Sequence, residues 1–305
     1  MRAITPEGLR ENVVSVPPVA WKADGELDFD QNRKLVRHIE DGGVSHLLYG
    51  GNANLYHFTG KQLASLLDFL RETVAATSCV IPSIGPDFGK MMDEVDILKA
   101  SGFNSAMLLP MAFPAQPEGV AIAVRRVAER LGNPVILYVK KDGYLTAETI
   151  SSLVNDGAVS FVKYAVEREN PADDNYLKEI IAGIGADLVG SGMGETPIHV
   201  HFPQYKVGTY TSGGVCIAPR AASALHKAFK SGDQATADEL LPPFIDFEKV
   251  RAQYNGISVI HDAIGLSGIA NMGPMLPMLA NVSQKNIAAV QSVVDGLVTL
   301  ESRFT

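Results

Sequence analysis

The sequence has little cysteine, little tryptophan and no long apolar segment. Its 305 residues include two cysteines, Cys79 and Cys216, and one tryptophan. Two cysteines exclude the disulfide framework of a small secreted domain and favour a reducing compartment. No apolar run approaches the roughly 18 residues that a membrane-spanning helix needs. The segment after Met1 lacks a signal-peptide pattern. We therefore expect a cytoplasmic protein that does not enter the membrane.

An excess of basic residues is also missing. Lysine and arginine total 26 against 34 acidic residues, which gives a formal net charge of −8. This balance argues against a general partner of nucleic acid or of anionic membranes, and it leaves room for a small anionic substrate in a local pocket. The hydrophobic share of 46% and the charged share of 20% are typical of a globular chain and exclude disorder.

Glycine and proline are plentiful, with 28 and 17 residues spread evenly along the chain. They separate short β-branched or leucine-rich runs from segments with apolar residues at i, i+3 and i+4 spacing. Such segments at 59–76 and 116–131 are predicted helices, and Thr59 with Gln62 forms a predicted capping box. We expect strands at 12–16, 44–49, 79–83, 104–109, 134–139, 159–165, 186–190 and 207–212.

Eight strand–helix units of about 21–35 residues indicate an α/β fold, the (β/α)8 TIM barrel, over residues 1–232. The competing architecture is a doubly wound open sheet, but the first strand runs into Pro17-Pro18 rather than a glycine-rich phosphate turn. Residues 233–305 are predicted to form a C-terminal helical extension with few polar groups suited to chemistry. It contains a helix at 233–254, interrupted at Pro242-Pro243, and a helix at 283–301 with Ser283 as its N-cap.

Catalytic side chains of such barrels project from the carboxyl ends of the strands. Lys163 lies there in the otherwise apolar run Ser160-Phe161-Val162-Lys163. A desolvated amine attacks a ketone to form a Schiff base, whereas the alternative is a solvated lysine at a strand end. Tyr138 ends another strand, where its phenol is able to shuttle protons beside such an amine. The alternative is a boundary tyrosine with a buried ring and a solvated hydroxyl.

Two turns on the same predicted face are candidates for substrate binding. The turn Gly50-Gly51-Asn52-Ala53-Asn54 follows the second strand, and its small residues let backbone N–H groups point at an anion such as a carboxylate. The same residues fit equally well a tight structural turn that contains glycine only for its backbone conformation. Ser212, before Gly213-Gly214, follows the last strand, and we include it among the substrate-binding residues.

A metal site is a weaker alternative. His199 and His201 are spaced to share one face of a strand, with Glu195 as the nearby third ligand that a catalytic metal needs, but Pro197 and Pro203 favour a loop. We therefore expect no metal and no organic cofactor, because an imine supplies the electrophile.

Taken in order, the glycine turn, Tyr138, Lys163, the Ser-Gly turn within 190–194 and Ala218-Pro219-Arg220 resemble the dihydrodipicolinate synthase / N-acetylneuraminate lyase family of Schiff-base aldolases. The resemblance covers about residues 10–300. It implies that Lys163 is the Schiff-base lysine, that Tyr138 is the proton-relay tyrosine and that turn 50–54 binds a keto-acid carboxylate through backbone amides. It also implies a homotetramer or homodimer.

The carboxylate-binding loop is atypical, because Gly51 and Asn52 stand where the family has two hydroxyl residues. The run Pro110-Met111-Ala112-Phe113 lacks the synthase's phenol, and 139–143 lacks its arginine, which Lys140 or Lys141 replaces loosely. We expect a lyase acting on pyruvate or a related 2-keto acid rather than a true synthase. The alternatives are a 2-keto-3-deoxy sugar acid aldolase or dehydratase, a metal-dependent barrel lyase, and a non-catalytic keto-acid sensor.

Overall fold

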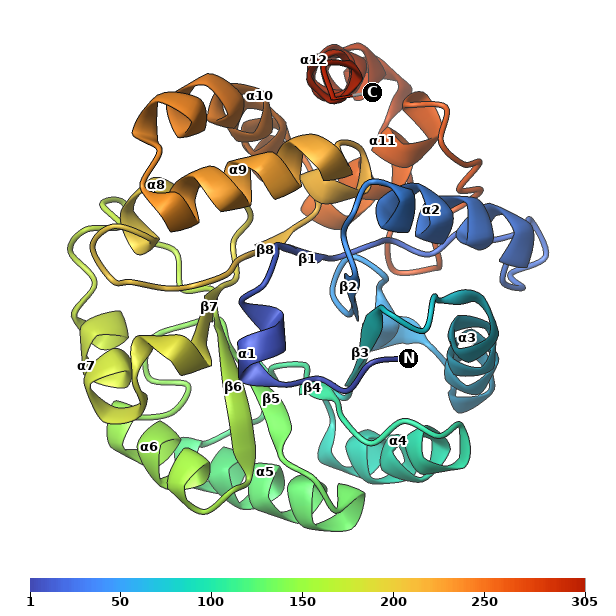
Figure 1. The fold of residues 1–305 in the computed structure, drawn as a ribbon. Helices are drawn as coiled ribbons and strands as arrows, with labels where there is room; N and C mark the ends of the chain where they lie inside the picture. Colours follow the sequence, from blue (N-terminus) through green and yellow to red (C-terminus); the bar gives the residue numbers. More distant parts are fainter. Residues whose placement is uncertain (305) are drawn as a thin grey trace.

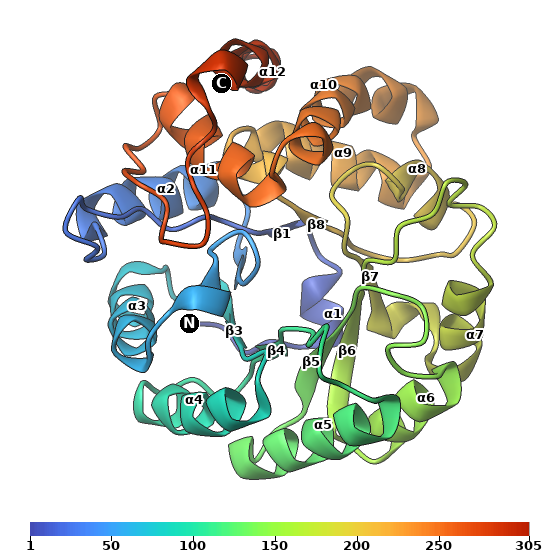
Figure 2. The ribbon, with the colours of Figure 1, turned by 180° about the vertical axis from the view of Figure 1, so that it is seen from behind.

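Eight parallel strands form the centre of the molecule, and helices surround them (Figure 1, Figure 2). The computed structural model describes residues 1–304. The strands pair in the order β7-β6-β5-β4-β3-β2-β1-β8, and a parallel bridge between Ser191 and Tyr210 closes the ring. They are β1 (Val14–Ser15), β2 (His46–Tyr49), β3 (Cys79–Ile84), β4 (Met107–Leu108), β5 (Val135–Val139), β6 (Val159–Tyr164), β7 (Val189–Ser191) and β8 (Thr211–Ser212). The predicted (β/α)8 barrel is confirmed.

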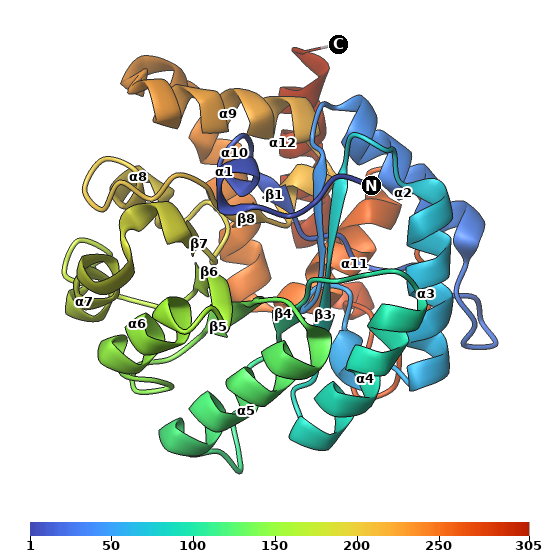
Figure 3. The same ribbon diagram turned by 60° about the horizontal axis from the view of Figure 1, so that its bottom comes forward.

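Amphipathic helices cover the outside of the barrel. In α3 (Gly60–Thr73), the Thr59–Gln62 capping box is present and the leucine stripe is buried, as the spacing predicts. The short α1 (Pro6–Leu9) precedes β1 and lies inside the ring of strands in Figure 1; Figure 3 gives a second view of it. The other helices are α2 (Phe29–Asp41), α4 (Phe88–Ala100), α5 (Pro117–Leu131), α6 (Ala147–Asn155), α7 (Asn175–Ile184), α8 (Ile198–His201) and α9 (Pro219–Ser231), with short 3-10 turns at η1 (Leu55–His57), η2 (Ala186–Leu188) and η3 (Gly214–Cys216).

The C-terminal extension consists of α10 (Gln234–Gln253), α11 (Gly256–Leu266), η4 (Gln284–Asn286) and α12 (Ile287–Ser302). These helices lie beside α9 and α2 (Figure 1) and share one buried hydrophobic cluster with them, including Leu35, Leu225, Phe244, Phe247 and Val294.

Two details of the extension differ from expectation. The helix containing Pro242-Pro243 is continuous rather than interrupted. Each proline removes one backbone hydrogen bond, and burial of Leu240, Phe244 and Phe247 compensates for that loss. The last α-helix begins at Ile287 after a 3-10 turn, and Ser283 makes no side-chain capping bond.

Pairing between strands sets the neighbours of the candidate lysine. Tyr138 on β5 pairs with Lys163 on β6, which in turn pairs with Gly190 on β7. Both side chains lie one residue before the carboxyl end of their strand, so they reach the same mouth of the barrel. Within residues 1–304, none of the helices has the length and apolar character required to cross a bilayer.

Candidate active site

Lys163 is buried at the carboxyl mouth of the barrel, with 6% of its surface exposed. Its Nζ donates a hydrogen bond to the Gly192 carbonyl at 3.1 Å and lies 3.6 Å from the ring centroid of Tyr138. A Cβ on Gly192 would lie 3.0 Å from the Lys163 Cγ and 2.8 Å from the Tyr164 carbonyl oxygen. The turn after β7 therefore requires glycine at this position, because the lysine stem packs directly against its backbone.

The surroundings favour the neutral form of the amine. Burial, with the positive charges of Lys140 and Arg251 acting in the same direction, lowers the pKa of Lys163 from 10.5 to about 7. A free amine is the nucleophilic form of lysine. Roughly half of the Lys163 side chains are thus able to attack a carbonyl carbon at neutral pH.

Tyr138 places a phenol beside this amine. Burial raises its pKa, and the nearby charges of Lys140 and Arg251 oppose that rise. The hydroxyl remains protonated at neutral pH, and within residues 1–304 it has no hydrogen-bond partner. The phenol is therefore free to exchange a proton with a bound substrate.

A cavity of about 670 Å³ opens at this mouth. Lys163, Tyr138, Gly51, Asn52 and Lys140 line it, which brings together residues from the loops or ends of β2, β5 and β6. Sequence reasoning missed further polar residues of the wall: Tyr56, Glu167, Arg168, Thr196, Glu248, Arg251, Tyr254 and Asn255. The volume falls in the range of small-molecule sites.

The glycine turn contributes in part. Gly51 and Asn52 line the cavity, whereas Gly50, Ala53 and Asn54 do not. Backbone N–H groups of residues 51–53 donate to no other group in the described chain, while the next amide, of Asn54, donates to the Gly51 carbonyl. Asn54 has a φ of 57° and is buried. The turn therefore presents uncommitted amides, the feature an anion site needs.

Ser212 is buried, and Thr211 and Gly213 line the cavity in its place. Alternation along β8 directs neighbouring side chains to opposite faces. The Ser212 hydroxyl donates to Glu195 Oε1 at 2.5 Å and accepts from the Val215 amide. The other oxygen of Glu195 is buried without a partner, and burial together with the Glu248 charge raises the pKa of this carboxyl.

The histidines do not form a metal site with Glu195. They lie on the short helix α8, where His199 is exposed and His201 is buried with its Nδ1 2.9 Å from the Ser191 hydroxyl. Among the residues described, no three His, Cys, Asp or Glu side chains are grouped to hold a metal ion. Desolvation lowers the pKa of His201 to about 4, so its imidazole is neutral.

The extension, in which we expect few polar groups suited to chemistry, contributes polar side chains to the cavity wall. Arg251 on α10 donates from Nη1 to Glu248 at 2.7 Å and from Nη2 to the Asn52 side chain at 3.0 Å. Asn52 in turn donates to the Val16 carbonyl at 2.8 Å. In the sequence, Glu248 and Arg251 have the i, i+3 spacing of an ordinary ion pair on the solvated face of a helix. Only the folded chain brings this pair to the barrel mouth.

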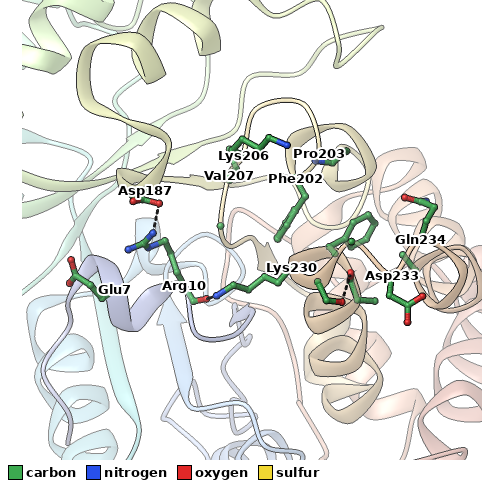
Figure 4. Close-up of a pocket in the computed structure, with 16 residues that line it drawn as sticks. Glu7, Arg10, Asp187, Phe202, Pro203, Lys206, Val207, Lys230, Asp233 and Gln234 are labelled. Carbon is green, nitrogen blue, oxygen red and sulfur yellow. Dashed lines mark hydrogen bonds and ion pairs between the residues drawn. The ribbon is translucent and has the colours of Figure 1, made fainter.

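A second cavity, of about 680 Å³, lies at the opposite end of the barrel. Its lining includes Asp187 just before β7 and Gly208 just before β8, together with α1 and the start of α10. Figure 4 shows the Arg10–Asp187 ion pair and Lys230, whose Nζ donates to the Arg10 carbonyl. The amino face of a barrel serves stability rather than catalysis, so the Lys163 cavity is the candidate active site.

Fold and site together define a (β/α)8 barrel with a buried lysine in a cavity at its carboxyl mouth. A family model described as the dihydrodipicolinate synthetase family matches residues 10–295, and the chain belongs to this family. A probable 5-dehydro-4-deoxyglucarate dehydratase 1 of Streptomyces avermitilis is 25% identical over 300 residues, covering 92% of this chain and 91% of that protein.

Solved structures agree on the fold. Dihydrodipicolinate synthase from Oceanobacillus iheyensis superposes with a TM-score of 0.83 at 19% identity, covering 96% of this chain and 99% of that chain. YagE from Escherichia coli, a prophage protein of the same family in complex with pyruvate, superposes with a TM-score of 0.79 at 18% identity, covering 93% of this chain and 98% of that chain. The predicted family resemblance is confirmed.

Proposed function

We propose that the protein is a Schiff-base dehydratase of a 2-keto-3-deoxy sugar acid, with 5-dehydro-4-deoxyglucarate as the leading candidate substrate. The observation that carries this proposal is the buried amine of Lys163 beside the Tyr138 phenol. In this substrate the ketone is adjacent to a carboxylate, and a methylene separates it from a hydroxyl-bearing carbon. These three groups are what an imine-based elimination uses.

The reaction begins when the Lys163 Nζ attacks the keto carbon and forms a C–N bond. Tyr138 protonates the carbonyl oxygen, and the carbinolamine loses water to give an iminium. The methylene carbon then gives a proton to the Tyr138 phenolate, and its electron pair moves toward the iminium nitrogen to form an enamine. The enamine expels the β-hydroxyl, which leaves as water after protonation. Hydrolysis of the resulting imine frees Lys163.

A dehydration needs one organic substrate, and this agrees with the composition of the cavity. The β4 loop supplies no phenol, because residues 110–113 contain no tyrosine, and Phe113 is 86% exposed outside the cavity wall. No arginine follows Tyr138 on its loop. A synthase would require groups for a second substrate at these places. Similarity to probable 5-dehydro-4-deoxyglucarate dehydratases supports the same choice.

The test is incubation with 5-dehydro-4-deoxyglucarate, with mass spectrometry for the loss of water and a coupled lactate dehydrogenase assay for pyruvate. Loss of water with wild type and none with Lys163→Met supports the dehydratase. Release of pyruvate instead identifies an aldolase, and substrate binding without any product identifies a sensor. Either of the last two results contradicts the proposal.

A further inference from the structure

Arg251 reaches the mouth of the barrel from α10, although it lies 199 positions beyond its partner Asn52. Arg251 lines the cavity, and its side chain is 15% exposed. Three of its five N–H groups are committed, to Glu248 Oε1, to Asn52 Oδ1 and, from Nε at 3.2 Å, to the Gly256 carbonyl. One N–H on each terminal nitrogen has no partner among residues 1–304.

The guanidinium sits where the ends of β1, β2 and β8 meet. A Cβ on Gly213 would lie 3.1 Å from Arg251 Nη1 and 3.3 Å from Asn52 Nδ2. Asn52 is itself tied to the Val16 carbonyl just after β1. Glycine at 213 therefore leaves the space that the arginine occupies, and three hydrogen bonds fix the orientation of its planar head.

Uncommitted donors occur on both sides of the Asn52–Arg251 contact. The free backbone amides of residues 51–53 belong to the same turn as the side chain that holds Arg251. A planar guanidinium matches a carboxylate in geometry and in charge. Glu248 offsets part of the charge, but it contacts one N–H only. Burial raises the pKa of Glu195, which favours its neutral form.

We propose that Arg251 binds the carboxylate of the keto acid together with the amides of Gly51 and Asn52, so that the C-terminal extension determines the preference for an acid over a neutral ketone. The choice of a ketone ligand rests on the proposed Schiff-base function. The competing explanation is structural: Arg251 would only fasten α10 to the barrel.

Two ketones of similar size separate these explanations. Pyruvate carries the carboxylate, and pyruvamide carries a neutral amide in its place. The rate of imine trapping at Lys163 by cyanoborohydride is measured for each by intact-mass spectrometry. We expect Arg251→Met to slow trapping with pyruvate about 10- to 100-fold, the loss typical of a hydrogen bond to a charged group. Trapping with pyruvamide should fall only through the rise in the Lys163 pKa that follows from removing the Arg251 charge, so the ratio of the pyruvate rate to the pyruvamide rate should still drop about 10-fold or more.

Arg220→Met is the matched control. Arg220 also connects barrel and extension, through Glu301 of α12, and it does not line the cavity. Its variant should leave the ratio of the two trapping rates unchanged. An equal loss with both ketones in Arg251→Met, or no loss with either, overturns the proposal. If this variant does not fold, Asn52→Ala removes the partner of the guanidinium and should shift the ratio in the same direction; an unchanged ratio there overturns it as well.

Lactate gives a measurement that does not depend on imine formation, because it has the carboxylate but no carbonyl. We expect calorimetry to detect lactate binding to wild type and to Arg220→Met, and to find it lost in Arg251→Met. Equal binding to all three proteins, or none to wild type, overturns the proposal. Loss of lactate binding in Arg251→Met without any imine in wild type would retain the carboxylate site and reject the Schiff-base function.

Discussion

Lys163 should react as a free amine at neutral pH, and its labelling rate measured against pH tests this directly. An ordinary lysine with a pKa of 10.5 is only about 0.03% deprotonated at pH 7, whereas a pKa of about 7 makes the free amine roughly half of the population. The difference is on the order of a thousandfold in reactive amine. We expect the labelling rate of Lys163 to rise with pH and to level off above its pKa.

The assay is pulse labelling with acetic anhydride from about pH 5.5 to about pH 9.5, with peptide mass spectrometry to read acetylation at Lys163. A synthetic peptide of residues 159–165 is the reference for a solvated lysine. A midpoint near 7 for the folded protein, with no plateau for the peptide, is the expected result. A midpoint near 10.5 in the folded protein would refute the burial argument.

The contribution of neighbouring charge is separable from that of burial. Lys140 lines the cavity and lowers the pKa of Lys163, so Lys140→Met should move the labelling midpoint to higher pH. Lys141→Met is the matched control, because Lys141 is also exposed but lies outside the cavity wall. Since Lys140 is exposed, added salt should weaken its effect in wild type. An equal shift in both variants would contradict the assignment.

Three further predictions concern catalysis, stability and packing. Tyr138→Phe should slow imine formation with pyruvate about 100-fold or more, as expected for loss of a general acid, while the final extent of trapping is unchanged; an unchanged rate would remove Tyr138 from the mechanism. Lys163→Met should raise the free energy of unfolding, because the folded protein holds this pKa at about 7 while the unfolded chain binds its proton up to 10.5. The free energy of unfolding of wild type therefore rises with pH across that interval. The variant should exceed wild type in free energy of unfolding by up to roughly 5 kcal/mol at pH 6, and thermal melts should show this difference shrinking toward pH 10. A difference that does not depend on pH contradicts this prediction. Gly213→Ala should lower the affinity for pyruvate, because the added Cβ displaces Arg251. Gly51→Ala should leave the melting temperature unchanged, because its Cβ meets no atom within 4 Å. If the two variants have equal melting temperatures and equal affinities, the contact between Gly213 and Arg251 is contradicted.

Much of the barrel could be predicted from the sequence because its signals are local. Most strands lie in short apolar runs bounded by turn residues, and α3 carries both a capping box and a leucine stripe within one helix. The prediction failed where distant packing decides. The helix through Pro242-Pro243 continues because Phe244 and Phe247 are buried against other elements, and no local pattern reports that burial.

The candidate site divides in the same way. Lys163 and Tyr138 were predictable, because a polar residue near the end of an apolar barrel strand projects toward the mouth. Arg251 was not, since its role depends on a contact with Asn52 that spans most of the chain. Ser212 follows its strand like the other candidates, but the alternation of β8 turns its hydroxyl toward Glu195 instead of the cavity.

Borohydride reduction in the presence of pyruvate tests the central claim most directly. We expect wild type to gain the mass of one reduced pyruvyl group, and peptide mapping to locate it on Lys163. The Lys163→Met variant should gain nothing under the same conditions. An unmodified Lys163, in an experiment that traps the imine of an established member of the family, would contradict the Schiff-base function.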